Sequence, residues 1–179
     1  MATAWAELVE HIGDLDVDKV AAALKNDKID VNQKNNLGYF PLSIAVRAIA
    51  DNKQLVQNKI SIIKLLVENG ANLEQEYEGN RNVVLSAAIS YGDRPIIKAL
   101  LDLGADPNHK FRIFGDTVFE PLLKSEYSPK NAILLFFYGG NWRTVNTKEI
   151  PRFELRMLWR RFNKSTDLAA INELEHLTP

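Results

Sequence analysis

Apolar residues between positions 60 and 138 recur with the spacing of helices. Three runs begin at Ile60, Ile96 and Ile133, and in each run apolar side chains fall three and four positions apart. This spacing predicts amphipathic α-helices. Each run stops close to a glycine, at Gly70, Gly104 and Gly139 respectively. Glycine ends a helix at low cost because it enters the left-handed conformation without a side-chain penalty.

The three helix ends recur at a nearly constant distance. Gly70 and Gly104 are 34 positions apart, and Gly104 and Gly139 are 35 apart. A small residue and then an Asn or Asp follow each glycine, and such a side chain starts a turn by bonding the backbone. A period of this length is typical of stacked helix–turn–helix units.

A second, shorter helix is predicted ahead of each run, at residues 41–46, 84–89 and 121–123. Pro41 and Pro121 suit the first position of a helix, where the missing N–H would have no partner. Ala45, Ala87 and Ala88 are small enough for neighbouring helices to approach closely. We therefore expect two helices per unit and close stacking between units.

These residues resemble the ankyrin repeat, whose core reads approximately G-x-T-P-L-H-x-A-A and then I-V-x-x-L-L-x-x-G-A-D-V-N. The best matches are Gly38…Pro41-Leu42…Ala45, Leu66-Val67…Gly70-Ala71-Asn72, and Ile96-Ile97…Leu100-Leu101…Gly104-Ala105-Asp106-Pro107-Asn108. The resemblance covers about residues 4–146 and implies an all-α solenoid of stacked helix–turn–helix units with short β-turn fingers. It implies one domain over 1–179: an N-terminal cap at 1–34, repeats at 35–146 and C-terminal capping helices at 147–179.

The capping segments have helical patterns of their own. Residues 4–12 and 18–25 are predicted to form the helices of the N-terminal cap. Residues 150–162 and 167–177 are predicted to form those of the C-terminal cap, since the end units of a repeat array close its exposed core.

The sequence departs from the family pattern in two ways that change the expected structure. No unit keeps Thr-Pro-Leu-His; the equivalents are Phe40-Pro41-Leu42-Ser43, Val83-Val84-Leu85-Ser86 and Glu120-Pro121-Leu122-Leu123. The threonine normally caps the helix, and losing a cap costs about 1 kcal/mol, so we expect a less stable array. The first full unit also carries roughly nine extra residues around 49–58, which we expect to lengthen both of its helices at the edge away from the fingers.

Composition and charge suit an ordinary soluble protein. Apolar residues make up 46% and charged residues 25%, and the formal net charge is −1, so bulk charge does not point to nucleic acid or a membrane. The N-terminus lacks the pattern of a secretory signal, and the longest uncharged stretch, 131–142, is shorter than the ~20 residues of a transmembrane helix. We expect a cytoplasmic protein, without membrane insertion, that is monomeric when free.

The chain offers little for catalysis. It has no cysteine, which excludes disulfides and thiolate chemistry, and its histidines, His11, His109 and His176, lack metal-ligand spacing. No phosphate-binding loop or Gly-x-Ser-x-Gly nucleophile elbow is present. We expect no enzyme activity, no metal, no cofactor and no small-molecule substrate.

The resemblance implies that another protein binds to the concave face, formed by the fingers and the exposed side of the inner helices. Tyr, Phe and Arg are enriched at binding hot spots. The candidate partner-binding residues at these positions are Tyr39, Arg47, Tyr77, Arg81, Asn82, Tyr91, Phe111, Arg112 and Phe114. The competing interpretation is that finger aromatics pack on the neighbouring finger; it is favoured for Phe40 and Phe119 and left open for the tyrosines and Phe111. Residues 109–119, which mix bases with aromatics, are the strongest single candidate segment.

A basic stripe forms a second candidate surface. Residues 143–164 hold seven bases against two acids, and within them Arg152, Arg156, Arg160 and Lys164 recur every four residues, along one face of the predicted helix. Two interpretations of this stripe are possible: a docking surface for an acidic partner, or a solvated face of the cap helix. The second interpretation is favoured.

Three functional hypotheses follow. The first is a protein-binding module that covers an enzyme as an inhibitor or immunity-type protein. The second is a bacterial effector or adaptor that engages a host protein. The third, disfavoured by the near-neutral charge, is binding of nucleic acid or another anionic ligand through the basic stripe.

Overall fold

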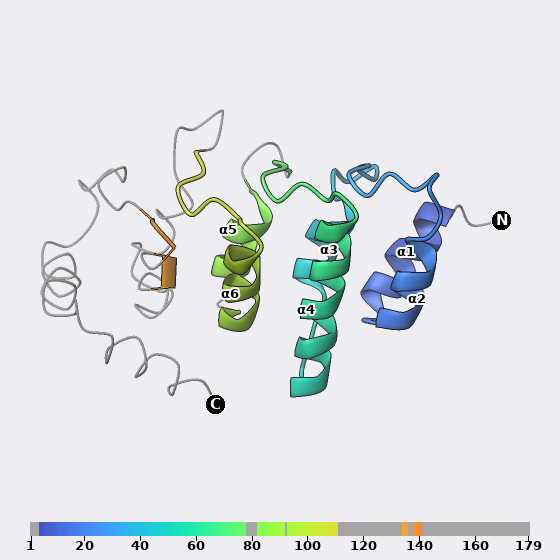
Figure 1. Ribbon diagram of the computed structural model, residues 1–179, viewed down its shortest axis with the longest axis horizontal. Coiled ribbons are helices and arrows are strands. Elements are labelled where there is room, and N and C mark those ends of the chain that lie inside the picture. Colours follow the sequence, from blue (N-terminus) through green and yellow to red (C-terminus); the bar gives the residue numbers. More distant parts are fainter. Residues whose placement is uncertain (1–3, 78–81, 92, 111–133, 136–137, 141–179) are drawn as a thin grey trace, which may run out of the picture. The chain divides into compact units, whose positions relative to one another are not determined.

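The computed structural model describes residues 4–77, 82–91, 93–110, 134–135 and 138–140, all of them in the first of two units of the chain, Met1–Val145. Six helices are named in this part of the chain, and they can be followed by their labels in Figure 1. They are α1 (Ala4–Gly13), α2 (Val17–Ala23), α3 (Pro41–Arg47), α4 (Lys53–Glu68), α5 (Val84–Ser90) and α6 (Arg94–Asp102). The helices predicted at 150–162 and 167–177 lie outside the described residues.

The helices pack as pairs, and the pairs stack on one another. α1 packs on α2, α3 on α4 and α5 on α6, so each consecutive pair forms an antiparallel hairpin. Across the stack, α1, α3 and α5 form one row, while α2, α4 and α6 form the other. The predicted all-helical array of stacked units is therefore confirmed for the described residues, which contain no strand and only an isolated bridge between Tyr77 and Asn82.

The apolar positions of the sequence pattern face the interior of the stack. In the hairpin of α3 and α4 the buried apolar side chains are Leu42, Ala45, Val46, Ile62, Ile63 and Leu66, and in that of α5 and α6 they include Leu85, Ala88, Ile89, Ile96, Ile97 and Leu100. Burying apolar surface stabilises the fold by about 25 cal/mol per Å². Ala45, Ala87 and Ala88 are all buried, as expected for small residues between closely packed helices.

Left-handed glycines follow the C-terminal ends of α4 and α6, as the sequence predicts, and a third glycine close after Leu135 has the same conformation. Gly70, Gly104 and Gly139 have φ values of 89°, 96° and 84°. In each case the N–H of the following residue reaches back five positions to a helix carbonyl: Ala71 to Leu66 at 2.9 Å, Ala105 to Leu100 at 3.0 Å and Gly140 to Leu135 at 2.9 Å. These bonds form the Schellman motif, which satisfies carbonyls at the helix end.

Serines supply part of the capping that the missing threonines would give. Phe40 and Val83 occupy the N-cap positions of α3 and α5. Their own side chains make no capping hydrogen bond. The Phe40 N–H donates to Ser43 Oγ at 2.9 Å, and the Ser43 hydroxyl donates to the Phe40 carbonyl at 2.7 Å. Ser86 bonds Val83 in the same way, at 3.0 Å and 2.8 Å. The cost of losing the threonine caps is therefore offset in part, a compensation that the sequence comparison with the repeat pattern missed.

The inserted residues lengthen only one of the two helices in their unit. α4 has 16 residues against 9 in α6, whereas α3 and α5 both have 7. The expectation that both helices lengthen is therefore wrong for α3. The chain leaves α3 at Ala48, whose ψ of 138° is not helical, and Asn52 starts α4 by accepting a bond from the Leu55 N–H at 2.9 Å.

The lengthened start of α4 is fastened to the hairpin turns on both sides. Asn58 Nδ2 donates to the carbonyl of Leu15, in the turn between α1 and α2, at 3.1 Å. Lys59, which is 4% exposed, forms a 3.1 Å ion pair with Asp93 at the start of α6. α4 therefore joins three consecutive hairpins through polar contacts as well as through apolar packing. Within the described ranges, no helix is both long and apolar enough to cross a membrane.

Candidate functional site

Five of the nine predicted partner-binding residues lie in the described part of the chain: Tyr39, Arg47, Tyr77, Asn82 and Tyr91. The other four, Arg81, Phe111, Arg112 and Phe114, lie outside it, as do Phe119, the basic stripe (Arg152, Arg156, Arg160 and Lys164) and all but the first two residues of the segment 109–119.

Three of the predicted residues come together around the Arg47 guanidinium. Its central carbon lies 4.8 Å from the ring centroid of Tyr39 and 5.9 Å from that of Tyr91. Arg47 is exposed, and Tyr91 is 54% exposed. Both distances fall within the ~6 Å range of cation–π attraction, which contributes about 0.5–1 kcal/mol at exposed sites. We call Tyr39, Arg47 and Tyr91 the Arg47 cluster.

Different elements of two stacked units supply the Arg47 cluster. Arg47 is the last residue of α3, and Tyr91 is the C-cap of α5. Tyr39 lies in the finger before α3, where Asn35 holds it: the Tyr39 N–H donates to Asn35 Oδ1 at 3.0 Å, and the Asn35 N–H donates to the Tyr39 carbonyl at 2.7 Å. The cluster therefore depends on the packing of α3 against α5.

Tyr77 lies beneath the cluster rather than on its surface. Its side chain is 1% exposed, and its ring centroid is 5.9 Å from that of Tyr39 and 5.7 Å from that of Phe40, in the second case nearly edge-on at 82°. The prediction that Tyr77 contacts a partner does not fit this burial, because the finger of the second unit packs onto that of the first and covers the ring. Phe40 is fully buried, so the packing role favoured for it is confirmed.

Asn82 closes the second finger. Its carbonyl accepts a bond from the Tyr77 N–H at 2.9 Å, and its own N–H donates to the Tyr77 carbonyl at 3.3 Å. Its side-chain oxygen lies 3.2 Å from the Ser86 hydroxyl, whose single proton it shares with the Val83 carbonyl. Asn82 is half-buried, and the contacts described give it a structural role in shaping the finger.

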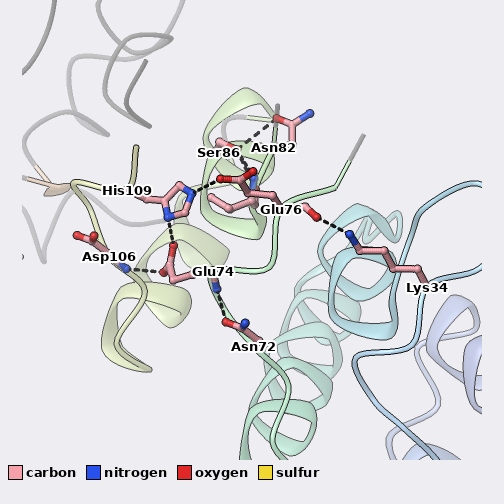
Figure 2. A network of polar contacts seen from close by, with 9 residues as sticks. Lys34, Asn72, Glu74, Glu76, Asn82, Ser86, Asp106 and His109 are labelled. Carbon is pink, nitrogen blue, oxygen red and sulfur yellow. Dashed lines mark hydrogen bonds and ion pairs between the residues drawn. The ribbon is translucent and has the colours of Figure 1, made fainter. Parts of the chain in front are cut away.

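A polar network joins the fingers of three units (Figure 2). His109 lies between two carboxylates, with Nδ1 2.9 Å from Glu74 and Nε2 3.4 Å from Glu76. The Asp106 N–H donates to Glu74 Oε1 at 2.8 Å, and Lys34 Nζ donates to the Glu76 carbonyl at 2.7 Å. We call these residues the finger network. The sequence analysis did not predict this network. A signal was available, because a histidine and two acids lie at corresponding positions of successive fingers.

Comparison with known proteins places the chain in a family. The family described as ankyrin repeats, in three copies, matches residues 9–111. The chain belongs to the ankyrin-repeat family. No curated protein matches the chain in sequence. Ankyrin repeats are generic modules of protein–protein interaction and are typically not enzymes, which agrees with the class of function expected from the sequence.

The ankyrin fingers of this chain are also joined by bonds that recur at equivalent positions. Asn32 Oδ1 accepts from the Asn72 N–H at 2.8 Å, and Asn32 Nδ2 donates to the Gly70 carbonyl at 2.9 Å. One ankyrin unit further on, Glu74 accepts from the Asp106 N–H, which lies two residues after Gly104 just as Asn72 lies two after Gly70. Side chains at this position thus connect each finger to the start of the next.

Glu74 differs electrostatically from an asparagine at the same ankyrin position. Burial raises the pKa of the Glu74 carboxyl above its ordinary value, while the bond from the Asp106 N–H and the nearby His109 act in the opposite direction. The charged form of Glu74 is therefore less favourable in the folded chain than in water.

The part of this ankyrin array that the structure describes holds no group of three or more His, Asp or Glu side chains arranged to hold a metal ion.

Proposed function

We propose that the chain binds a partner protein through the first two fingers and the adjoining ends of α3 and α5, with the Arg47 cluster at the centre. The observation that carries the proposal is the cluster itself, in which Tyr39, Arg47 and Tyr91 from two stacked units form one surface patch. Arg and Tyr are among the residue types that dominate binding hot spots. The generic role of ankyrin repeats in protein interaction supports the same conclusion.

The rigidity of this patch supports the proposal further. Tyr39 rests on the buried ring of Tyr77, which in turn rests on Phe40 in the core. The finger that carries Tyr39 is also held by bonds to Asn35. A preformed patch loses less conformational entropy when a partner docks, so more of the contact energy appears as affinity. Leu37, in the same finger, is 75% exposed and adds apolar area.

We propose further that the partner is an enzyme and that the chain covers it as an inhibitor or immunity-type protein. The support for this form of the proposal is the preformed Arg47 cluster, because a patch that is ordered before binding can cover a partner's surface with little loss of conformational entropy. An effector or adaptor that engages a host protein uses the same face, and the identity of the partner separates the two.

The test is affinity capture with the full chain as bait, from lysates of the source cell and of a host or prey cell, followed by mass spectrometry. We expect one protein to be recovered in stoichiometric amount and to resist salt. Tyr91→Ala and Arg47→Ala should release it, whereas Lys64→Ala, which truncates an exposed side chain on α4, should retain it. Normal capture by Tyr91→Ala and Arg47→Ala, together with loss in Arg156→Glu, would move the site to the basic stripe.

A further inference from the structure

We propose that Asn69 is a site of spontaneous deamidation, and that Asn32 of the preceding finger limits the rate by holding the segment that follows α4. Asn69 stands directly before Gly70, and this is the only Asn-Gly pair in the sequence. Asparagine is among the chemically labile residues of proteins. The proposal concerns a covalent modification and does not depend on the proposed binding function.

The reaction joins a backbone nitrogen to the neighbouring side chain. The Gly70 amide nitrogen loses its proton and attacks Cγ of Asn69, which closes a succinimide ring. The Cγ–Nδ2 bond breaks, and the amide nitrogen leaves as ammonia, which carries the proton away. Water then opens the ring at either of its carbonyl carbons and leaves aspartate or isoaspartate. Glycine favours the attack because it has no Cβ to crowd its nitrogen.

The position of this pair in the fold makes it reachable. Asn69 is the C-cap of α4, and both Asn69 and Gly70 are exposed to solvent. The ends of helices open locally at a lower free energy than the core of a protein does. The reaction therefore needs only an opening of the end of α4 and not the unfolding of the whole array.

In the closed state both reacting groups are engaged in hydrogen bonds. The Gly70 N–H donates to the Val67 carbonyl at 3.0 Å, so its proton is held. Asn69 Nδ2 donates to the Leu65 carbonyl at 2.8 Å, which holds the side chain against the last turn of α4. Both bonds must break before the nitrogen can attack Cγ.

Asn32 adds bonds from outside the helix. Its Nδ2 donates to the Gly70 carbonyl at 2.9 Å, and its Oδ1 accepts from the Asn72 N–H at 2.8 Å. These bonds hold the chain on both sides of Ala71 against the preceding finger. Moving Gly70 out of its closed position breaks them, so Asn32 lowers the population of the reactive open state.

The products weaken the same joint. Aspartate at position 69 has no N–H to donate to the Leu65 carbonyl, and its negative charge lies at the C-terminal end of α4, where the helix dipole disfavours it. Isoaspartate adds one carbon to the main chain before Gly70 and so displaces the groups that Asn32 bonds. Modification should therefore loosen the contact between the first and second fingers.

The test is incubation of the folded full chain in mildly alkaline buffer, followed by peptide mass spectrometry and isoaspartate labelling. Asn32→Ala should raise the deamidation rate of Asn69 about 5- to 100-fold, the range for losing two hydrogen bonds that oppose the opening. Asn108→Ala is the matched control. It removes the corresponding bond to the Gly139 carbonyl, at 3.0 Å, and should leave the rate at Asn69 unchanged.

A conservative variant and an unfolded control complete the experiment. Asn32→Asp keeps an oxygen for the Asn72 N–H but cannot donate to the Gly70 carbonyl, so its rate should lie between those of the wild type and Asn32→Ala. If Asn32→Ala unfolds by circular dichroism, Asn32→Asp decides the question. In urea, Asn69 should react faster than any other asparagine of the wild type, and Gly70→Ala should remove that advantage.

Three results would overturn the proposal. In urea, a rate at Asn69 no higher than at the other asparagines would remove the chemical site. Equal rates in the folded wild type and both Asn32 variants would show that Asn32 does not control the opening. Equal acceleration by Asn32→Ala and Asn108→Ala would mean that the reaction follows unfolding of the whole array.

Discussion

Gly70 and Gly13 show how the same residue type has different roles at two helix ends. Gly70 has φ at 89°, in the left-handed region, whereas Gly13 ends α1 without a positive φ. Neither has an atom within 4 Å of the place where a Cβ would lie. The difference between the two positions is therefore one of backbone conformation and not of space.

Gly70→Ala should lower the free energy of unfolding by about 1–2 kcal/mol, the cost of holding a residue with a Cβ in the left-handed conformation. Gly13→Ala should be neutral or should stabilise by up to about 1 kcal/mol, because alanine restricts the unfolded chain and fits a helix. Urea denaturation of both variants measures the difference. Equal effects at the two positions would contradict the role given to Gly70.

Glu74 provides a residue-scale test of electrostatics. Burial raises its pKa above the ordinary value of 4.5, so the folded chain holds this proton more tightly than the unfolded chain does. Stability therefore falls as the pH rises from the unfolded-state pKa through the higher folded-state pKa. Glu74→Gln removes this titration but keeps an oxygen to accept the Asp106 N–H.

Relative to the wild type, Glu74→Gln should become progressively more stable as the pH rises through that window. Urea denaturation at several values between about pH 4 and pH 7 measures the trend. Glu68→Gln, at the exposed end of α4, is the control for the change in net charge. A stability difference that stays constant with pH, or that declines, would show that the ionised Glu74 is not penalised by burial.

At the scale of elements, α4 is the helix that departs most from a regular repeat. Its extra residues carry Asn58 and Lys59, which reach the turns of the two neighbouring hairpins. Removing one partner of a buried ion pair leaves the other charge without compensation. Through the ion pair of Lys59 and Asp93, the extra residues of α4 therefore contribute to the stability of the fold.

Lys59→Met should destabilise the chain by about 1–3 kcal/mol, because Asp93 is then left partly buried without its cation. The double variant Lys59→Met, Asp93→Asn should lose less than the sum of the two single changes, since neither charge remains unpaired. Thermal or urea unfolding of the four proteins completes the cycle. Strict additivity would mean that the 3.1 Å contact contributes no coupling.

At the scale of the whole molecule, we expect one tyrosine to contribute mainly to stability and another to contribute mainly to partner binding. In a stacked array the stability resides largely in the interfaces between neighbouring units. Tyr77 lies at such an interface, where it packs against Tyr39 and Phe40, whereas Tyr91 is 54% exposed. The two rings are thus expected to serve different purposes.

Tyr77→Ala should cost about 3 kcal/mol or more of unfolding free energy, as expected for truncating a buried aromatic ring. Tyr91→Ala should cost under about 1 kcal/mol and instead lose the captured partner. Circular dichroism melting curves, read beside the capture experiment, distinguish the two effects. A destabilised Tyr91→Ala protein, or a stable Tyr77→Ala protein that fails to bind, would reverse these assignments.

The sequence by itself determined the local events of this ankyrin chain. Helix periodicity, the glycine ends at Gly70 and Gly104 and the proline start at Pro41 depend on interactions within a few residues, so the described helices were predictable. Residues of binding type at positions 39, 47 and 91 were also visible. The order of the stacked units followed from the repeat.

Only the tertiary structure decided which of those residues meet and which are buried. Tyr77 and Tyr91 look alike in sequence, yet one ring is covered by the neighbouring finger and the other is exposed. The contact of Glu74 with His109 spans 35 positions, and that of Lys59 with Asp93 spans 34. The physical reason is that stacking brings residues about one repeat apart into contact, and side-chain packing between units then sets burial, which sequence spacing alone does not specify.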